Sequence, residues 1–164
     1  MKTPEVRLRK YKKNLVTSGW GVIVFCVWDI VKYISTFFIK SSYSEYLEEF
    51  LPEDDKALYA FAIFFTLIIL GLILFLHAFV GKCAIQVGQG KRHRLNYIPV
   101  AIILVLMTLF SFVTGIVEIN SMPLDLSIAS LILDSTMLVA LMDLLISSFK
   151  VRSLEKQTAA KGGV

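Results

Sequence analysis

The chain has 164 residues, of which 56% are hydrophobic and only 18% are charged, and its mean hydropathy is +0.70. This composition is too apolar for an ordinary soluble domain of this length. The net charge of +4 and the pI near 9.1 do not indicate a nucleic-acid-binding protein. A nucleic-acid binder gathers its basic residues on one face of a folded domain, whereas here they lie at the ends of apolar runs.

Four apolar runs organise the chain, at residues 15–39, 58–80, 97–117 and 124–149. Each matches the stretch of about 20 residues that a helix needs to cross roughly 30 Å of hydrocarbon. The first run ends in Phe38-Ile39, and Lys40 follows with no small-residue cleavage site, so we expect a retained anchor helix rather than a signal peptide. The sequence therefore predicts an all-α polytopic membrane protein, a four-transmembrane-helix bundle forming one integral membrane domain over residues 1–164.

The segment between the first two runs predicts a further short helix at residues 42–51. Ser42 and Glu45 fit a capping box, aromatic and leucine residues follow at helical spacing, and Pro52 ends the segment. An amphipathic helix lying on the outer membrane surface explains this pattern. It is either a lid or docking surface with an acidic outward face or, more simply, a loop held at the interface by its aromatic residues.

The sign of the charge alternates from one connecting segment to the next. Residues 1–14 carry six basic residues against one acid, residues 81–96 carry four against none, and residues 150–164 carry four against one. Residues 40–57 instead carry six acids against two basic residues, and the connection around Glu118 and Asp125 has no basic residue. The positive-inside rule therefore predicts a plasma or bacterial inner membrane protein with both termini and the loop near residue 91 in the cytoplasm.

Ionisable residues inside the runs are the candidate site. Each costs at least about 2.5 kcal/mol if it faces lipid at mid-membrane, so each is expected to face a neighbouring helix or water. At a rise of about 1.5 Å per residue, Asp29, Lys32 and Asp134 share one layer in the outer half, and His77 and Asp143 a second near the inner boundary. The outer layer is either a cation, proton or polar-substrate site or a structural ion pair. The inner pair either lies at the membrane interface, with His77 at a helix end, or forms a proton relay.

Small and polar residues form two stripes on the fourth run. One stripe contains Ser127, Ser130 and Asp134, and the other contains Thr136, Ala140, Asp143 and Ser147. Nine residues separate the two aspartates, which rotates one about 180° from the other. We therefore expect one stripe to face the bundle interior and the other an adjoining subunit. The third run carries a seam of small residues suited to close helix contact: Thr108, Ser111, Thr114 and Gly115.

Motifs for chemistry are missing from the sequence. Neither Cys26 nor Cys83 has a Cys or His at ligand spacing, so no metal is expected. The segment 88–94 lacks the first glycine and the Ser or Thr of a phosphate loop, so no nucleotide cofactor is expected either. Three basic residues of this segment are candidate contacts for anionic lipid headgroups: Lys91, Arg92 and Arg94.

These patterns favour a non-enzymatic membrane subunit that binds the lipid bilayer and associates with itself or with a partner membrane protein, without nucleic acid. The alternative is a small homo-oligomeric transporter or channel that uses the layer of Asp29, Lys32 and Asp134. An intramembrane enzyme is a distant third, because no nucleophile lies beside a base and no metalloprotease motif is present.

Overall fold

Four long helices make up the part of the chain that the computed structural model describes. These residues are 3–39, 56–91, 96–117 and 124–161, with the backbone alone at 29, 32–39, 56–59, 62–63, 124–127 and 159–161. The helices are α1 (Pro4–Ile39), α3 (Lys56–Gly88), α4 (Ile98–Val117) and α5 (Leu124–Lys161), and the described residues contain no strand. The expected interfacial helix at 42–51 lies outside the described residues.

Helix bounds follow from local chemistry. Pro4 is the first residue of α1, a position where the missing N–H is not needed and the fixed φ suits a helix. At the end of α3, Gly90 has a φ of 73°, and the N–H of Lys91 donates to the carbonyl of Gln86 at 2.9 Å. This is a Schellman arrangement, in which a glycine in the left-handed region ends the helix and satisfies its last carbonyls.

Two helices are much longer than the apolar runs that predict them. α1 begins 11 residues before the first run, and α5 continues 12 residues beyond the fourth. The added residues include many Arg, Lys, Leu and Glu, which are good helix formers. The hydrophobic run therefore marks the apolar part of each helix and not the whole helix.

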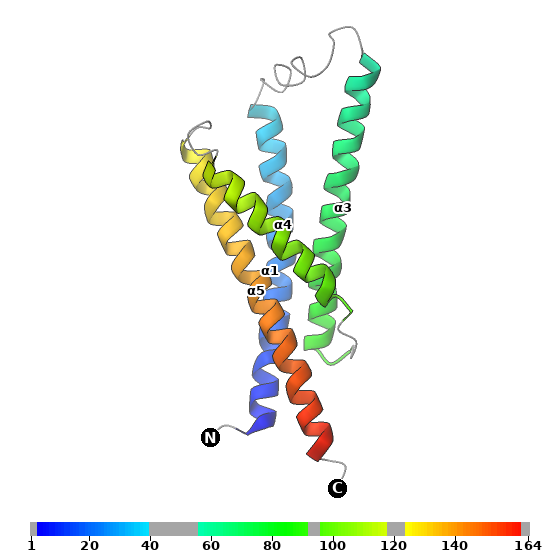
Figure 1. The fold of residues 1–164 in the computed structure, drawn as a ribbon, viewed down its shortest axis with the longest axis vertical. Coiled ribbons are helices and arrows are strands. Elements are labelled where there is room, and N and C mark those ends of the chain that lie inside the picture. Colours follow the sequence, from blue (N-terminus) through cyan, green and yellow to red (C-terminus); the bar gives the residue numbers. More distant parts are fainter. Residues whose placement is uncertain (1–2, 40–55, 92–95, 118–123, 162–164) are drawn as a thin grey trace.

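α1 and α5 lie at the centre of the arrangement. α1 packs extensively against both α3 and α5, α5 also packs against α4, and α3 and α4 barely meet (Figure 1). Both chain termini lie at one end of the molecule, here called the terminal end, and the helices spread apart toward the opposite end. The described helices thus form a chain of neighbours, α3–α1–α5–α4, rather than four equivalent corners.

The buried core lies in the half of the bundle nearer the terminal end. Its largest fully buried side chains include Tyr97, Leu15, Leu104, Leu141 and Leu144. In the opposite half, apolar side chains of α3 from Phe61 to Leu72 are mostly exposed within the monomer. Among the described side chains, the buried apolar contacts thus gather in the terminal half.

Glycines bring α1 and α3 into close contact in the terminal half. A Cβ added to Gly81 would lie 2.7 Å from the carbonyl oxygen of Gly19 and 2.6 Å from Cγ1 of Ile23. A Cβ added to Gly88 would lie 2.6 Å from the carbonyl oxygen of Lys12. Both positions exclude any side chain, so the two backbones approach as small-residue contacts in membrane helices allow.

Three of the described helices are long and apolar enough to cross a membrane. They cover Phe64–Gly88 in α3, Ile98–Val117 in α4 and Ile128–Thr158 in α5. This agrees with an all-helical protein in an integral membrane location. The first predicted span falls within α1, where most side chains after Trp28 lie outside the described part of the chain, so a fourth span is not shown.

Candidate functional site

Asp143 lies at the contact between α5 and α1. The hydroxyl of Ser18 on α1 donates a hydrogen bond to its Oδ2 atom at 2.5 Å. Ser18 is 8% exposed, and Gly21, one turn further along α1, lies opposite Ala140, with a Cβ position 3.8 Å from the Ala140 methyl. The part of the polar stripe that contains Ala140 and Asp143 is therefore covered by α1 of the same chain, whereas Thr136 is exposed.

Asp134 lies at the contact between α5 and α4. Its side chain is 5% exposed, and the hydroxyl of Ser111 on α4 donates to its Oδ2 atom at 3.2 Å. Gly115 lies close by, because a Cβ there would lie 3.3 Å from Leu131. Two members of the predicted small-residue seam, Ser111 and Gly115, thus face α5, where they allow close approach and supply a hydroxyl to a buried carboxylate.

Asp134 and Asp143 lie on two sides of α5 that contact different helices of the same chain. α5 lies between α1 and α4, so Asp143 and Asp134 each receive a serine hydroxyl from a different neighbour. The sequence predicted that one of the two stripes faces the bundle interior and the other an adjoining subunit. In this arrangement α5 has two covered sides, and neither aspartate depends on another subunit for a hydrogen bond.

Asp29 and Lys32 have backbones in α1, and their side chains lie outside the described residues. Their depth follows from the antiparallel contacts of α1 and α5. Starting from the opposed residues Gly21 and Ala140, eight further residues along α1 correspond to eight residues back along α5. Residue 29 is then level with about residue 132, within one turn of Asp134. A common depth agrees with the predicted layer, and contact among its three side chains stays a prediction.

His77 is buried on the side of α3 that faces the bundle, with 5% of its surface exposed. Its Nδ1 atom lies 2.8 Å from the carbonyl oxygen of Ile73. Because a carbonyl only accepts, Nδ1 carries a proton and donates it to Ile73. The other ring nitrogen, Nε2, is buried and has no hydrogen-bond partner among the described residues. Buried polar atoms are normally satisfied, so Nε2 is an exception.

No hydrogen bond joins His77 to Asp143, the pair expected near the inner boundary. On α1, Gly19 lies against Gly81 and Cys26 against Leu74, so His77 is level with a residue between 19 and 26. Asp143, bonded to Ser18, is about 8 Å nearer the terminal end. No direct hydrogen bond therefore supports the predicted pairing of His77 with Asp143.

The sequence did not predict the pair of hydrogen-bonded hydroxyls at the terminal end. The Tyr97 hydroxyl lies 2.8 Å from Oγ of Ser148, which donates to the carbonyl of Leu144 at 2.6 Å. Since Ser148 has a single proton, Tyr97 donates to Ser148. Both residues are fully buried, and neighbouring Ser147 keeps a buried hydroxyl without a partner among the described residues. An aromatic residue at the start of one helix and paired serines near the end of another were the only signals.

The three candidate lipid-binding residues follow the end of α3. Lys91 is exposed at the Schellman turn, while Arg92 and Arg94 lie outside the described residues. The exposure of Lys91 leaves its ammonium group free to meet headgroups or water. Contact with anionic lipid stays a prediction for all three residues.

Chemically, the site is a set of buried and partly buried polar groups along the faces of α5 and α3. Asp134 and Asp143 accept hydrogen bonds from serine hydroxyls, and the imidazole of His77 and the hydroxyl of Ser147 each have a buried atom without a hydrogen-bond partner among the described residues. No group of three or more His, Cys, Asp or Glu residues suited to a metal ion occurs in the described part of the chain. Comparisons of the chain with protein-family models, with curated proteins and with solved structures found no match.

Proposed function

We propose that this protein is a non-enzymatic subunit of a membrane complex that works by helix–helix association with copies of itself or with a partner membrane protein. The observation that carries the proposal is the exposure of α3 in the half away from the termini. Seven large apolar residues there are between 42% and 63% exposed: Phe61, Phe64, Phe65, Leu67, Ile68, Ile69 and Leu72.

These residues surround the helix rather than lining one stripe. Phe64, Phe65 and three consecutive residues, 67–69, point in different directions around a helix of 3.6 residues per turn. This half of α3 therefore gains little packing from its own chain. Van der Waals packing is a main source of stability between helices in a membrane, because lipid tails are as apolar as the side chains. A neighbouring helix supplies the packing that α3 does not obtain within the monomer.

The proposal includes four spans with both termini in the cytoplasm. Three helices are long and apolar enough to span, and α1 runs antiparallel to α3 and α5 along contacts from Lys12 to Cys26. Both termini lie at one end of the molecule, as an even number of spans requires. Cysteines introduced at Ser44 and Arg94 test the orientation. We expect an impermeant thiol reagent to label only the first in intact cells, and labelling of both contradicts it.

Photocrosslinking tests the association itself. Benzoylphenylalanine placed at Phe65, on the exposed half of α3, is expected to give a crosslinked protein in native membranes. Trp20 is 57% exposed on α1 in the packed terminal half and serves as the matched control. An adduct of twice the mass identifies a second copy, and another mass identifies a partner. If Phe65, Ile68 and Leu72 all give lipid adducts alone, the association proposal fails.

Transport is the second candidate function, favoured by the burial of Asp134 at 5% exposure among apolar helices. An intramembrane acid is expensive and commonly marks an ion or proton path. Asp29→Asn and Asp134→Asn remove the charge and keep the shape. Loss of proton- or cation-coupled flux in liposomes, with assembly intact, would establish transport through the layer of Asp29, Lys32 and Asp134. Unchanged assembly and no flux in the unaltered protein exclude it.

A further inference from the structure

α1 and α5 extend beyond the other two helices at the terminal end (Figure 1). The end of α3 is marked by Gly88, which lies against Lys12, and the start of α4 by Tyr97, which is bonded to Ser148. Residues 4–13 of α1 and 149–161 of α5 therefore form a two-helix projection that begins level with the end of α3, with the α5 part about 18 Å long.

The projection is strongly basic. Residues 4–13 and 150–161 hold nine basic residues and two acids, whereas the whole chain has a net charge of only +4. On α1, Arg9, Lys10 and Lys13 are exposed, and on α5 Arg152 and Lys156 are exposed one turn apart. Charges of one sign on a protruding element create a field that attracts and orients an oppositely charged partner.

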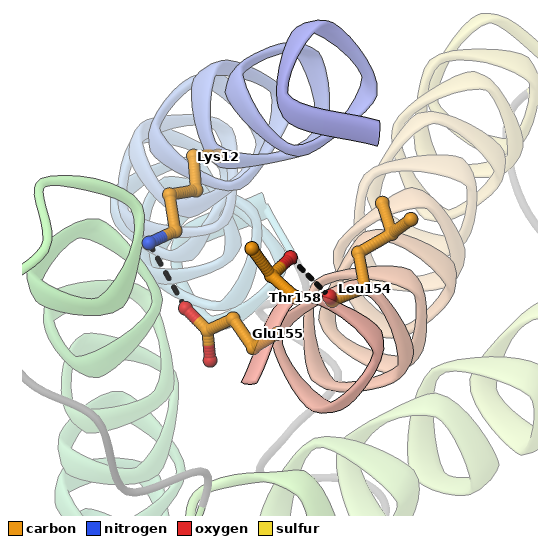
Figure 2. Close-up of polar contacts among 4 residues, drawn as sticks. All are labelled: Lys12, Leu154, Glu155 and Thr158. Carbon is orange, nitrogen blue, oxygen red and sulfur yellow. Dashed lines mark hydrogen bonds and ion pairs between the residues drawn. The ribbon is translucent and has the colours of Figure 1, made fainter. Parts of the chain in front are cut away.

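The two helices of the projection are held together. Nζ of Lys12 lies 2.9 Å from Oε1 of Glu155, as Figure 2 shows, with the two side chains 25% and 35% exposed. Leu8 and Tyr11 of α1 pack against the core, and Val151 of α5 is fully buried. An exposed ion pair of this kind contributes at most about 1 kcal/mol, so the apolar contacts supply most of the rigidity.

This geometry argues against the surface of the surrounding membrane as the binding partner. A basic helix that binds lipid lies in the membrane plane with its apolar face inserted. Here Leu8, Tyr11 and Val151 are already used in packing, and Val6 and Phe149, each 50% exposed, are single apolar residues on different helices. The headgroup layer is about 5–8 Å thick on each side, so the last turns of α5 reach beyond it. The positive-inside rule accounts for basic residues at this end of the molecule, but it does not require that they lie on two helices packed together.

We propose that the projection of α1 and α5 docks an acidic segment of a cytoplasmic protein. Exposed guanidinium and ammonium groups recognise Asp and Glu carboxylates, and Arg forms paired hydrogen bonds with them. The cytoplasmic location rests on the orientation proposed above, whereas the binding chemistry does not depend on helix association in the membrane. A negative photocrosslinking result therefore leaves this proposal standing.

Binding is measured with the full chain in nanodiscs of zwitterionic phosphatidylcholine, where both ends of the protein are accessible. The probe is a fluorescein-labelled peptide of 20 glutamates, followed by fluorescence anisotropy. We expect R9E/K10E and R152E/K156E each to weaken binding by about tenfold, because each variant turns attraction into repulsion. Raising the salt from 50 to 500 mM should weaken binding of the unaltered protein, because screening shortens the range of the field.

The matched control is K91E/R92E, which makes the same change of charge outside the projection. We expect it to weaken binding by less than about threefold. Equal loss in the control and projection variants, or no binding by the unaltered protein, overturns the proposal. A dye on a cysteine at Gln157 tests the lipid alternative in nanodiscs containing phosphatidylserine. Quenching by spin-labelled headgroups places the projection on the membrane and also overturns the proposal.

Discussion

Replacing Gly81 by Ala is expected to separate α1 from α3. The new Cβ would lie 2.7 Å from the carbonyl oxygen of Gly19 and 2.6 Å from Cγ1 of Ile23, closer than a real Cβ comes to another heavy atom. The carbonyl belongs to the backbone of α1 and cannot rotate away as the end of a side chain can. Overpacking of this kind costs about 1–3 kcal/mol, because the helices must shift or leave their preferred rotamers.

Gly71→Ala is the matched control on the same helix. A Cβ at Gly71 meets nothing within 4 Å, so only the helix preference of Ala over Gly acts there, which is worth about 0.5–1 kcal/mol in the opposite direction. Gly81→Ala gains the same helix preference, so the two variants should differ by the overpacking cost alone, about 1–3 kcal/mol in unfolding free energy. In thermal unfolding in mild detergent, this is a gap of about 2–12 °C. Equal stability of the two variants would refute the close α1–α3 contact.

Three further substitutions test the buried polar groups, each by unfolding in the same detergent. Ser18→Ala should cost about 1–3 kcal/mol, because it leaves the Asp143 carboxylate without its hydrogen bond, and an unchanged stability contradicts that bond. Tyr97→Phe should cost only about 0.5–1.5 kcal/mol, since Ser148 keeps its own acceptor, and a larger loss points to a more extended network. His77→Phe should be neutral or stabilising by up to about 1 kcal/mol if Nε2 is dry, whereas destabilisation indicates that a buried water or ligand satisfies it.

Hydrophobic runs predicted where the helices lie, because each run is as long as the apolar helix needed to cross a membrane. They did not predict where the helices end. The basic segments before Leu15 and after Phe149 continue as helix through residues of high helix propensity, which a hydrophobic criterion does not register. The same criterion does not predict a helix end that depends on a glycine, such as the end of α3 before Gly90.

The angular spacing of the two aspartates along α5 can be read from the sequence, whereas the order of the neighbouring helices cannot. The half-turn between Asp134 and Asp143 follows from helical geometry alone. Which helix covers each side depends on the order of packing, and α5 lies between α1 and α4, an arrangement that periodicity does not encode. The expectation that one aspartate faces another subunit rested on assuming a bundle with a single interior.

The close contact between α1 and α3 was not predicted. Its signal in the sequence was a pair of glycines seven residues apart, Gly81 and Gly88, on a long apolar run and its continuation. That spacing places them on one face, two turns apart. Small residues at such spacing indicate contact in membrane helices even where no polar group is involved.

The central position of α5 has a consequence for how the protein is made. Synthesis proceeds from the N-terminus, so α1 and α3 can close their glycine contact while the rest of the chain is still being translated. α4 then emerges with almost no surface on α3 to receive it, because its principal neighbour, α5, comes last. The nascent chain therefore holds an unsupported α4, with Ser111 unpaired, until the C-terminal helix arrives. A chain that stops before residue 124 lacks the principal neighbour of α4, so we expect it to be degraded faster in cells than the full chain.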